Sequence, residues 1–132
     1  MATRTALTTE QLAAIPGSYF KAVDAFDVKR VGTHFAGDAV LTVQTDHRTF
    51  NGRDEIERMF SDFFAASKTI FHDIRNMVVQ TELRKVATEQ GYQGELKDGN
   101  VNDMHNCNFF DINEDGEIQR MIIWMAGTNP LK

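Results

Sequence analysis

The sequence has little that would tie it to an oxidising compartment, a membrane or a nucleic acid. Its one cysteine, Cys107, cannot form an intrachain disulfide, so secretion is not indicated. No apolar run approaches the roughly 20 residues of a membrane helix, and the polar N-terminus lacks the apolar stretch of a signal peptide. The net charge is −5 with scattered basic residues, whereas nucleic acids require concentrated Lys and Arg. We therefore expect a cytoplasmic protein without a membrane or nucleic-acid partner.

The composition is that of one folded domain. A chain of 132 residues is of the usual size for a single domain with one core, and no repeat or linker interrupts residues 1–132. The hydrophobic fraction of 42% and the charged fraction of 25% are ordinary for globular proteins. Ten phenylalanines stand against two tyrosines and one tryptophan, which indicates either a plain phenylalanine core or the wall of an apolar pocket.

Helical signals come first along the chain. Thr8 and Gln11 form a capping-box pattern at a helix start. Pro16 lacks an N–H and clashes with the preceding turn, so we expect a break there and a restart of the helix. Asp27 can cap a second, short helix. A third helix is predicted from Gly52, because apolar residues then recur at helical spacing. These are Ile56, Met59, Phe60, Phe63 and Phe64.

Strand signals fill the remainder. β-branched residues predict a short strand over 38–45, followed by a turn and a return strand near 49–50. Four longer strands are predicted over 69–81, 84–92, 101–112 and 117–125. Asp115 and Gly116 form a hairpin-turn pair between the last two. Helices followed by strands indicate an α+β design in which the helices cover one face of a curved sheet.

The signals for metal binding and nucleophilic catalysis are weak. Residues 111–116 reproduce the first half of a calcium-binding loop, but the twelfth position, which requires Glu, is Ile122. A polar hairpin turn is therefore the preferred interpretation. The histidines lack zinc spacing, and no nucleophile elbow surrounds a serine or Cys107. We expect neither a metal nor a cofactor.

The strand that begins at Phe71 carries a more informative pattern. Alternation places His72 and Asn76 on the face toward the helices, among apolar neighbours. Asp73 and Arg75 mark the other face as solvent or interface. Buried polar groups need partners, so His72 and Asn76 are either satisfied structurally or line a ligand cavity. The pattern alone leaves both alternatives open.

The order of these elements resembles the nuclear transport factor 2-like superfamily, especially its SnoaL-like polyketide cyclase and ketosteroid isomerase branches. The resemblance rests on residues 18–27, 34–41, 52–64 and the closing hairpin at 110–118, and it covers nearly the whole chain. It implies a cone-shaped half-barrel, with N-terminal helices packed on a curved, mostly antiparallel sheet.

The resemblance also implies roles for individual residues. Tyr19 matches the tyrosine that donates a hydrogen bond to the substrate oxyanion in ketosteroid isomerases. Asp24 and His72 match an aspartate and a pocket histidine of scytalone dehydratase, and Tyr92 is nearest to its second pocket histidine. Asn108 stands where the isomerases have a second oxyanion donor. The carboxylate base of the isomerases falls near Val43, which cannot transfer a proton, so their own mechanism is not expected here.

The function implied is a cofactor-independent isomerase, cyclase or dehydratase that acts on a small apolar carbonyl or polyketide-like molecule. His72 would be the acid/base, Tyr19 and Asn108 the oxyanion donors, and Asp24 the group that orients the imidazole. The substrate would contact a further set of residues: Phe20, Val43, Phe60, Phe64, Asn76, Tyr92 and Trp124. The alternative is a non-catalytic domain of the same fold that binds a ligand or dimerises.

A homodimer through the convex sheet face is also expected. Phe71 and Met77 would otherwise be exposed there beside charged residues, and large apolar side chains on a solvent face often mark an association surface. Members of the superfamily commonly pair through this sheet.

Overall fold

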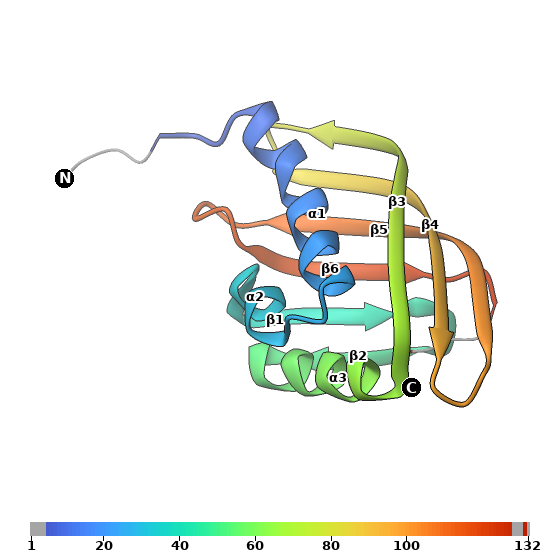
Figure 1. The fold of residues 1–132 in the computed structure, drawn as a ribbon. Helices are drawn as coiled ribbons and strands as arrows, with labels where there is room; N and C mark the ends of the chain where they lie inside the picture. The colour runs from blue at the N-terminus through green and yellow to red at the C-terminus, as the bar shows by residue number, and fades with distance from the viewer. Residues whose placement is uncertain (1–4, 128–130, 132) are drawn as a thin grey trace.

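The helices of this protein lie together on one face of a six-stranded sheet (Figure 1). The computed structural model describes residues 5–127 and 131. Within that part of the chain the helices are α1 (Thr9–Asp24), α2 (Val28–Thr33) and α3 (Gly52–Ala66). The strands are β1 (Phe35–Val43), β2 (Arg48–Asn51), β3 (Ser67–Gln80), β4 (Lys85–Leu96), β5 (Val101–Ile112) and β6 (Ile118–Trp124), with a 3-10 turn over Gln44–Asp46. None of the helices in the described residues has the length and apolar character needed to span a bilayer.

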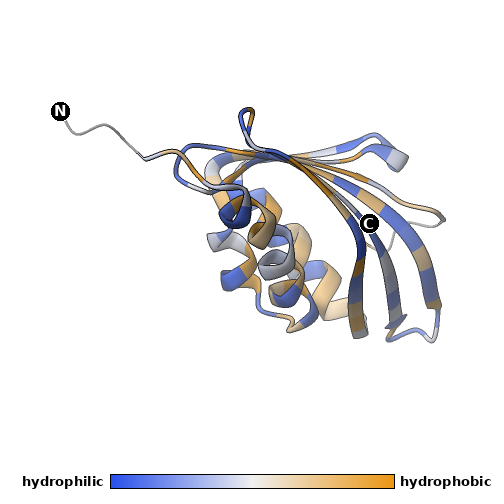
Figure 2. Cartoon of the chain, turned by 90° about the horizontal axis from the view of Figure 1, so that it is seen from above, coloured by the Kyte–Doolittle hydropathy of each residue, from blue (hydrophilic) through white to orange (hydrophobic). Residues whose placement is uncertain are grey.

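The strand order is β2-β1-β6-β5-β4-β3. Every neighbouring pair is antiparallel except β1 and β6, which run parallel. The sheet curves round the helices without closing into a barrel (Figure 2), so the predicted α+β half-cone with a mostly antiparallel sheet is confirmed. We call the face toward the helices concave and the other face convex.

Helix α1 begins as predicted but does not break. The Thr8 hydroxyl accepts from the Gln11 amide at 3.1 Å, and the Gln11 side chain accepts from the Thr8 amide at 2.8 Å, which completes the capping box. The predicted interruption at Pro16 is wrong, because α1 is continuous through it. Pro16 is buried, as are Leu12 and Tyr19 on the same helix. Burial of this apolar stripe outweighs the lost backbone hydrogen bond.

The other two helices are confirmed. The Asp27 carboxylate accepts from the Arg30 amide at 3.1 Å and caps α2. In α3 the predicted stripe is buried throughout: Ile56, Met59, Phe60, Phe63 and Phe64. These side chains fill much of the space between α3 and the concave face of the sheet.

A β-bulge in β3 changes which side chains face the helices. Ile74 pairs with Gln90, whereas Asn76 pairs with Glu89, so Arg75 is an extra residue. A one-residue insertion reverses the alternation beyond it. His72 and Ile74 keep the predicted concave orientation, but Asn76 turns to the convex face and Met77 packs against the core. The predictions for Asn76 and Met77 are therefore wrong.

Candidate active site

A cavity of about 30 Å³ lies between the helices and the concave face of the sheet. Its volume is about that of two water molecules. Helices α1 and α3 contribute aromatic rings to its wall, and the sheet contributes polar side chains to its floor. The apolar wall includes Phe20, Phe60, Phe63, Ile123, Met125 and Leu131.

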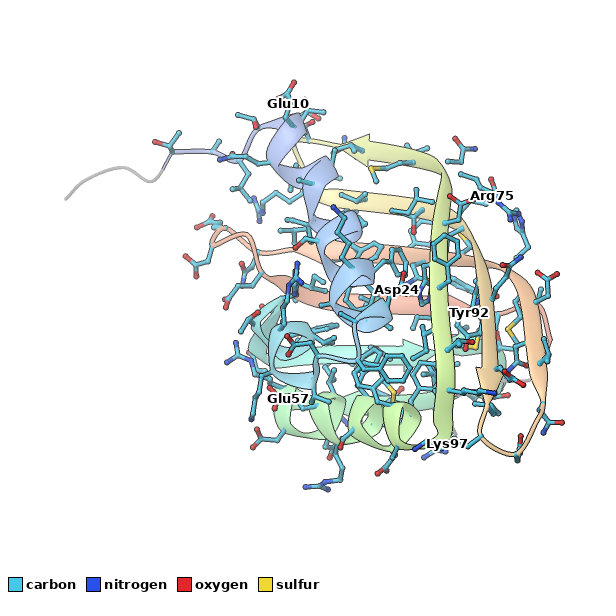
Figure 3. All side chains as sticks on the ribbon, viewed as in Figure 1. Glu10, Asp24, Glu57, Arg75, Tyr92 and Lys97 are labelled. Carbon is cyan, nitrogen blue, oxygen red and sulfur yellow. The ribbon has the colours of Figure 1, made fainter. Side chains whose placement is uncertain are left out.

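The strongest polar contact at the cavity joins the end of α1 to β3. One carboxylate oxygen of Asp24, Oδ1, lies 2.6 Å from His72 Nδ1. The other, Oδ2, accepts from the His72 backbone N–H at 3.0 Å. Asp24 is the last residue of α1 and lies beside β3 (Figure 3). A carboxylate engaged at both oxygens holds the imidazole in one orientation relative to the cavity.

This contact also determines which ring nitrogen carries the proton. A carboxylate oxygen only accepts hydrogen bonds, so Nδ1 must be the donor. In the neutral imidazole, Nε2 is then left with a lone pair. Nε2 has no hydrogen bond to any described residue, and His72 lines the cavity. Chemically, an imidazole held in this tautomer by a carboxylate is able to accept a proton at Nε2.

Aromatic rings pack around the imidazole. Phe20 stacks on His72 with centroids 4.6 Å apart and an interplanar angle of 25°. The ring of Tyr92 lies 5.1 Å from His72 on a neighbouring strand. The His72 side chain is 12% exposed, so most of the ring is shielded from water while the remainder stays reachable. Such enclosure strengthens electrostatic interactions at the ring.

Both tyrosines at the cavity stay protonated. Burial and then the Asp24 charge raise the pKa of Tyr19 far above its ordinary value. The same causes raise the pKa of Tyr92 to about 12. The Tyr19 hydroxyl has no hydrogen-bond partner among the described residues. It is therefore a neutral donor available to a ligand, the property that suits a phenol to binding an oxyanion.

The Tyr92 hydroxyl is buried without a partner in the described structure. It lies over Gly94, where any Cβ would collide with it. Glycine at position 94 therefore allows the Tyr92 ring to fold along its own strand and pack beside His72 and Phe63.

A chain of buried amides forms the floor. The Thr88 hydroxyl donates to Gln90 Oε1 at 2.8 Å, and Gln90 Nε2 donates to Asn108 Oδ1 at 2.9 Å. Asn106 lies opposite Gln90 across the β4–β5 ladder. Gln90, Asn106 and Asn108 all line the cavity and are at most 5% exposed. This band supplies the polar half of the site.

Many of the residues expected at the site do come together. Asp24 contacts His72, and the cavity is lined by Tyr19, Phe20, Phe60, His72, Tyr92 and Asn108. Their convergence follows from the helical register of α1 and α3 and from the alternation of β3, β4 and β5, all of which direct these side chains to the concave face.

Four expected contact residues lie elsewhere. Val43 is fully buried in the core but does not line the cavity. The ring of Phe64 packs on Phe26 at 5.4 Å, and its neighbour Phe63 takes the place at the cavity. Asn76 and Trp124 are on the convex face, Asn76 because of the bulge. On β6 it is Ile123 that lines the cavity, so the next residue, Trp124, points to the opposite face of the sheet.

The sequence reading missed several lining residues, among them Gln90 and Asn106. The signal was available: Thr88, Gln90 and Tyr92 alternate on one strand, as Asn106 and Asn108 do on the next. Continuing the alternation from Asn108 and Tyr92 would have placed both amides inward.

The remaining chemistry of the described residues is sparse. No group of three or more His, Cys, Asp or Glu residues in the described part could hold a metal ion. Burial, followed by the charge of Glu89, raises the pKa of Cys107, so its thiol stays protonated and is a poor nucleophile. The 111–116 segment forms a hairpin turn, in which Asn113 Oδ1 accepts from the Asp115 and Glu117 amides.

The fold and the site define a class of protein. The family model for the SnoaL-like domain matches residues 17–121, and this chain belongs to that family, a branch of the nuclear transport factor 2-like superfamily. No curated protein sequence matches it.

Solved structures agree on the fold. A proposed aromatic ring hydroxylase from Novosphingobium aromaticivorans superposes with a TM-score of 0.82 at 21% identity, over 96% of this chain and 99% of that one. A proposed SnoaL-like polyketide cyclase from Shewanella denitrificans has a TM-score of 0.78 at 13% identity, over 87% and 90%. The BvnE pinacolase from Penicillium brevicompactum has a TM-score of 0.78 at 17% identity, over 88% and 86%. At these identities the likeness establishes the fold and not the reaction.

Proposed function

We propose that this protein is a cofactor-independent enzyme that removes and returns a proton next to the carbonyl group of a small apolar molecule. Isomerisation, cyclisation and dehydration all use this chemistry. The proposal rests on one observation: His72 lines the cavity, and its Nδ1 lies 2.6 Å from the Asp24 carboxylate. The polyketide cyclase and pinacolase among the structural neighbours are compatible with it by analogy of fold.

In the proposed reaction, His72 Nε2 takes a proton from the carbon beside the carbonyl. The electron pair of that C–H bond moves into the C–C bond, and negative charge develops on the carbonyl oxygen. Tyr19 and Asn108 donate hydrogen bonds to this oxygen. Asp24 stabilises the imidazolium that forms. The imidazolium then returns the proton, to a different carbon in an isomerisation or to a departing hydroxyl in a dehydration.

The substrate class follows from the lining. Aromatic rings of Phe20, Phe60 and Phe63 suit an apolar body, and the polar floor suits one oxygen function. A cavity of about 30 Å³ admits a molecule larger than a few atoms only if side chains move. The same small volume favours a second candidate, a non-catalytic domain whose polar interior is satisfied core.

We also propose a homodimer that associates through the convex face. With Met77 turned inward, the exposed apolar residues on this face include Phe71, Val78, Phe109 and Trp124, each at least 40% exposed. Phe109 and Trp124 stack edge to face at 5.5 Å. An apolar patch of this kind is typical of an association surface.

The experiment that separates the two candidates is His72→Ala. In an enzyme, the loss of a general acid/base lowers the rate about 10²–10⁴-fold. Turnover would be sought with a panel of cyclic ketones, aromatic ketones and polyketide lactones. In a non-catalytic domain the imidazole is a structural link between α1 and β3. Its loss would then lower the melting temperature, with ligand binding intact.

A further inference from the structure

The hydrogen bonds of the floor amides have a direction that the structure determines. The backbone N–H of Ala126 donates to Asn106 Oδ1 at 3.1 Å. A backbone N–H can only donate, so the amide oxygen of Asn106 must face Ala126 and the NH₂ group must point the other way. No described residue accepts a hydrogen bond from that NH₂ group, although Asn106 is only 5% exposed. Asn106 lines the cavity.

Asn108 and Gln90 are oriented by the same logic. Asn108 Nδ2 lies 3.6 Å from the Met121 sulfur, which has no proton to donate. The oxygen of Asn108 accepts from Gln90 Nε2, and the oxygen of Gln90 accepts from the Thr88 hydroxyl. Each floor amide thus uses its oxygen within the protein. The capacity left over on these three amides consists of N–H groups.

We propose that Asn106 is a ligand-binding residue whose Nδ2 donates to the carbonyl oxygen of the substrate, so that the floor selects ligands that only accept hydrogen bonds. This inference rests on the proposed function and names its substrate class further, as a ketone and its enolate in preference to the matching alcohol. Among the described residues the NH₂ group of Asn106 has no acceptor, so an accepting oxygen of a ligand in the cavity would complete its hydrogen bonding. An alcohol would bring a further donor to a floor that already has donors in excess.

The hydrogen bond from Asn106 Nδ2 becomes stronger as negative charge develops on the carbonyl oxygen during the reaction. A hydrogen bond to a neutral carbonyl favours binding by about 5-fold, and one to a charged oxygen by about 10-fold or more. Asn106 therefore stabilises the enolate more than the ketone. This difference is the condition for an interaction that accelerates a reaction.

The test is Asn106→Asp, measured at a pH at which NMR shows the new carboxyl group to be ionised, because a carboxylate still accepts from the Ala126 N–H and has no proton to donate into the cavity. Asn102→Asp makes the same change on β5 outside the cavity and is the matched control. The probes are cyclopentanone, cyclopentanol and methylenecyclopentane, which share a ring and differ in the oxygen function. Dissociation constants are measured by NMR titration, and the side-chain NH₂ signals of Asn106 are followed in the unaltered protein.

We expect the unaltered protein to bind cyclopentanone about 5-fold more tightly than methylenecyclopentane, with the alcohol between them. The NH₂ signals of Asn106 should shift with the ketone and stay in place with the hydrocarbon. N106D should lose the ketone preference, and N102D should keep it.

Retention of the ketone preference by N106D, or NH₂ signals that do not respond to the ketone, overturns the assignment and leaves Asn106 as an anchor for Ala126. If no probe binds at millimolar concentration, the proposed function fails together with this inference. If the ketone binds through Asn106 but His72→Ala leaves proton exchange unchanged, the proposed function fails and this inference stands.

Discussion

Asp24→Asn is the most informative change at the proposed base, because it keeps the shape of the side chain and reverses one hydrogen bond. The His72 backbone N–H, 3.0 Å from the carboxylate, can only donate, so the oxygen of the new amide must stay there. The NH₂ group then faces His72 Nδ1, which must accept. The single proton of the neutral imidazole moves to Nε2, and the lone pair that faces the substrate is lost.

The expected effect on catalysis is large and the effect on folding is small. A wrong tautomer of this kind lowers a rate by about 10³–10⁴-fold, by analogy with the aspartate of a serine-protease triad. A charge-assisted hydrogen bond becomes a neutral one, at a cost of about 1 kcal/mol. The Asp24 side chain is 23% exposed, so water reduces that cost further. The melting temperature should fall by no more than about 4 °C.

The tautomer can be measured without a substrate. Long-range ¹H–¹⁵N correlation spectra distinguish a protonated ring nitrogen from one with a lone pair. In the unaltered protein Nδ1 should carry the proton, and in D24N the proton should be on Nε2. Protonation of Nε2 in the unaltered protein at neutral pH, or an identical pattern in both proteins, would refute the reasoning about the base.

Two further changes test the cavity wall and the outer face. Tyr92→Phe removes a buried hydroxyl without a partner and should raise the melting temperature slightly at neutral pH. The fold raises the Tyr92 pKa from 10.0 to about 12. The stability that comes from this shift is complete below pH 10.0 and is lost as the pH rises through about 12. Y92F should therefore resist alkaline unfolding better, and a lower melting temperature at neutral pH would contradict this. Val78→Asp should convert the proposed dimer to a monomer in light scattering, whereas Leu83→Asp, an exposed apolar residue in the turn after β3, should not. A monomeric unaltered protein at micromolar concentration counts directly against the dimer.

The periodicity of the sequence was sufficient to predict features that depend on a single helix or strand. The stripe of α3 and the bounds of β5 follow from spacing alone. The orientation of His72 toward the helices also follows from alternation, because the bulge at Arg75 lies beyond it on β3. The continuous α1 could not be predicted in this way, since Pro16 is tolerated only because of what the helix packs against.

Contacts between different helices and strands could not be predicted from the periodicity of the sequence. The bulge depends on the pairing of β3 with β4, and it reverses Asn76 and Met77 without a mark in the sequence. The Asp24–His72 contact joins segments far apart in the chain and was expected only from the family resemblance. The orientation of Asn106 depends on Ala126, which follows the neighbouring strand β6. Such an orientation is a property of tertiary structure.

The central claim is that His72 transfers a proton next to a carbonyl group. The most direct measurement is the rate at which deuterium from D₂O enters the α-positions of cyclopentanone, followed by ¹H NMR, with the unaltered protein and His72→Ala at equal concentration. The account predicts exchange above the buffer rate with the unaltered protein, and a loss of about 10²-fold or more in H72A while H72A remains folded at the assay temperature. Equal exchange by the two proteins, in the presence of demonstrated cyclopentanone binding, would contradict it.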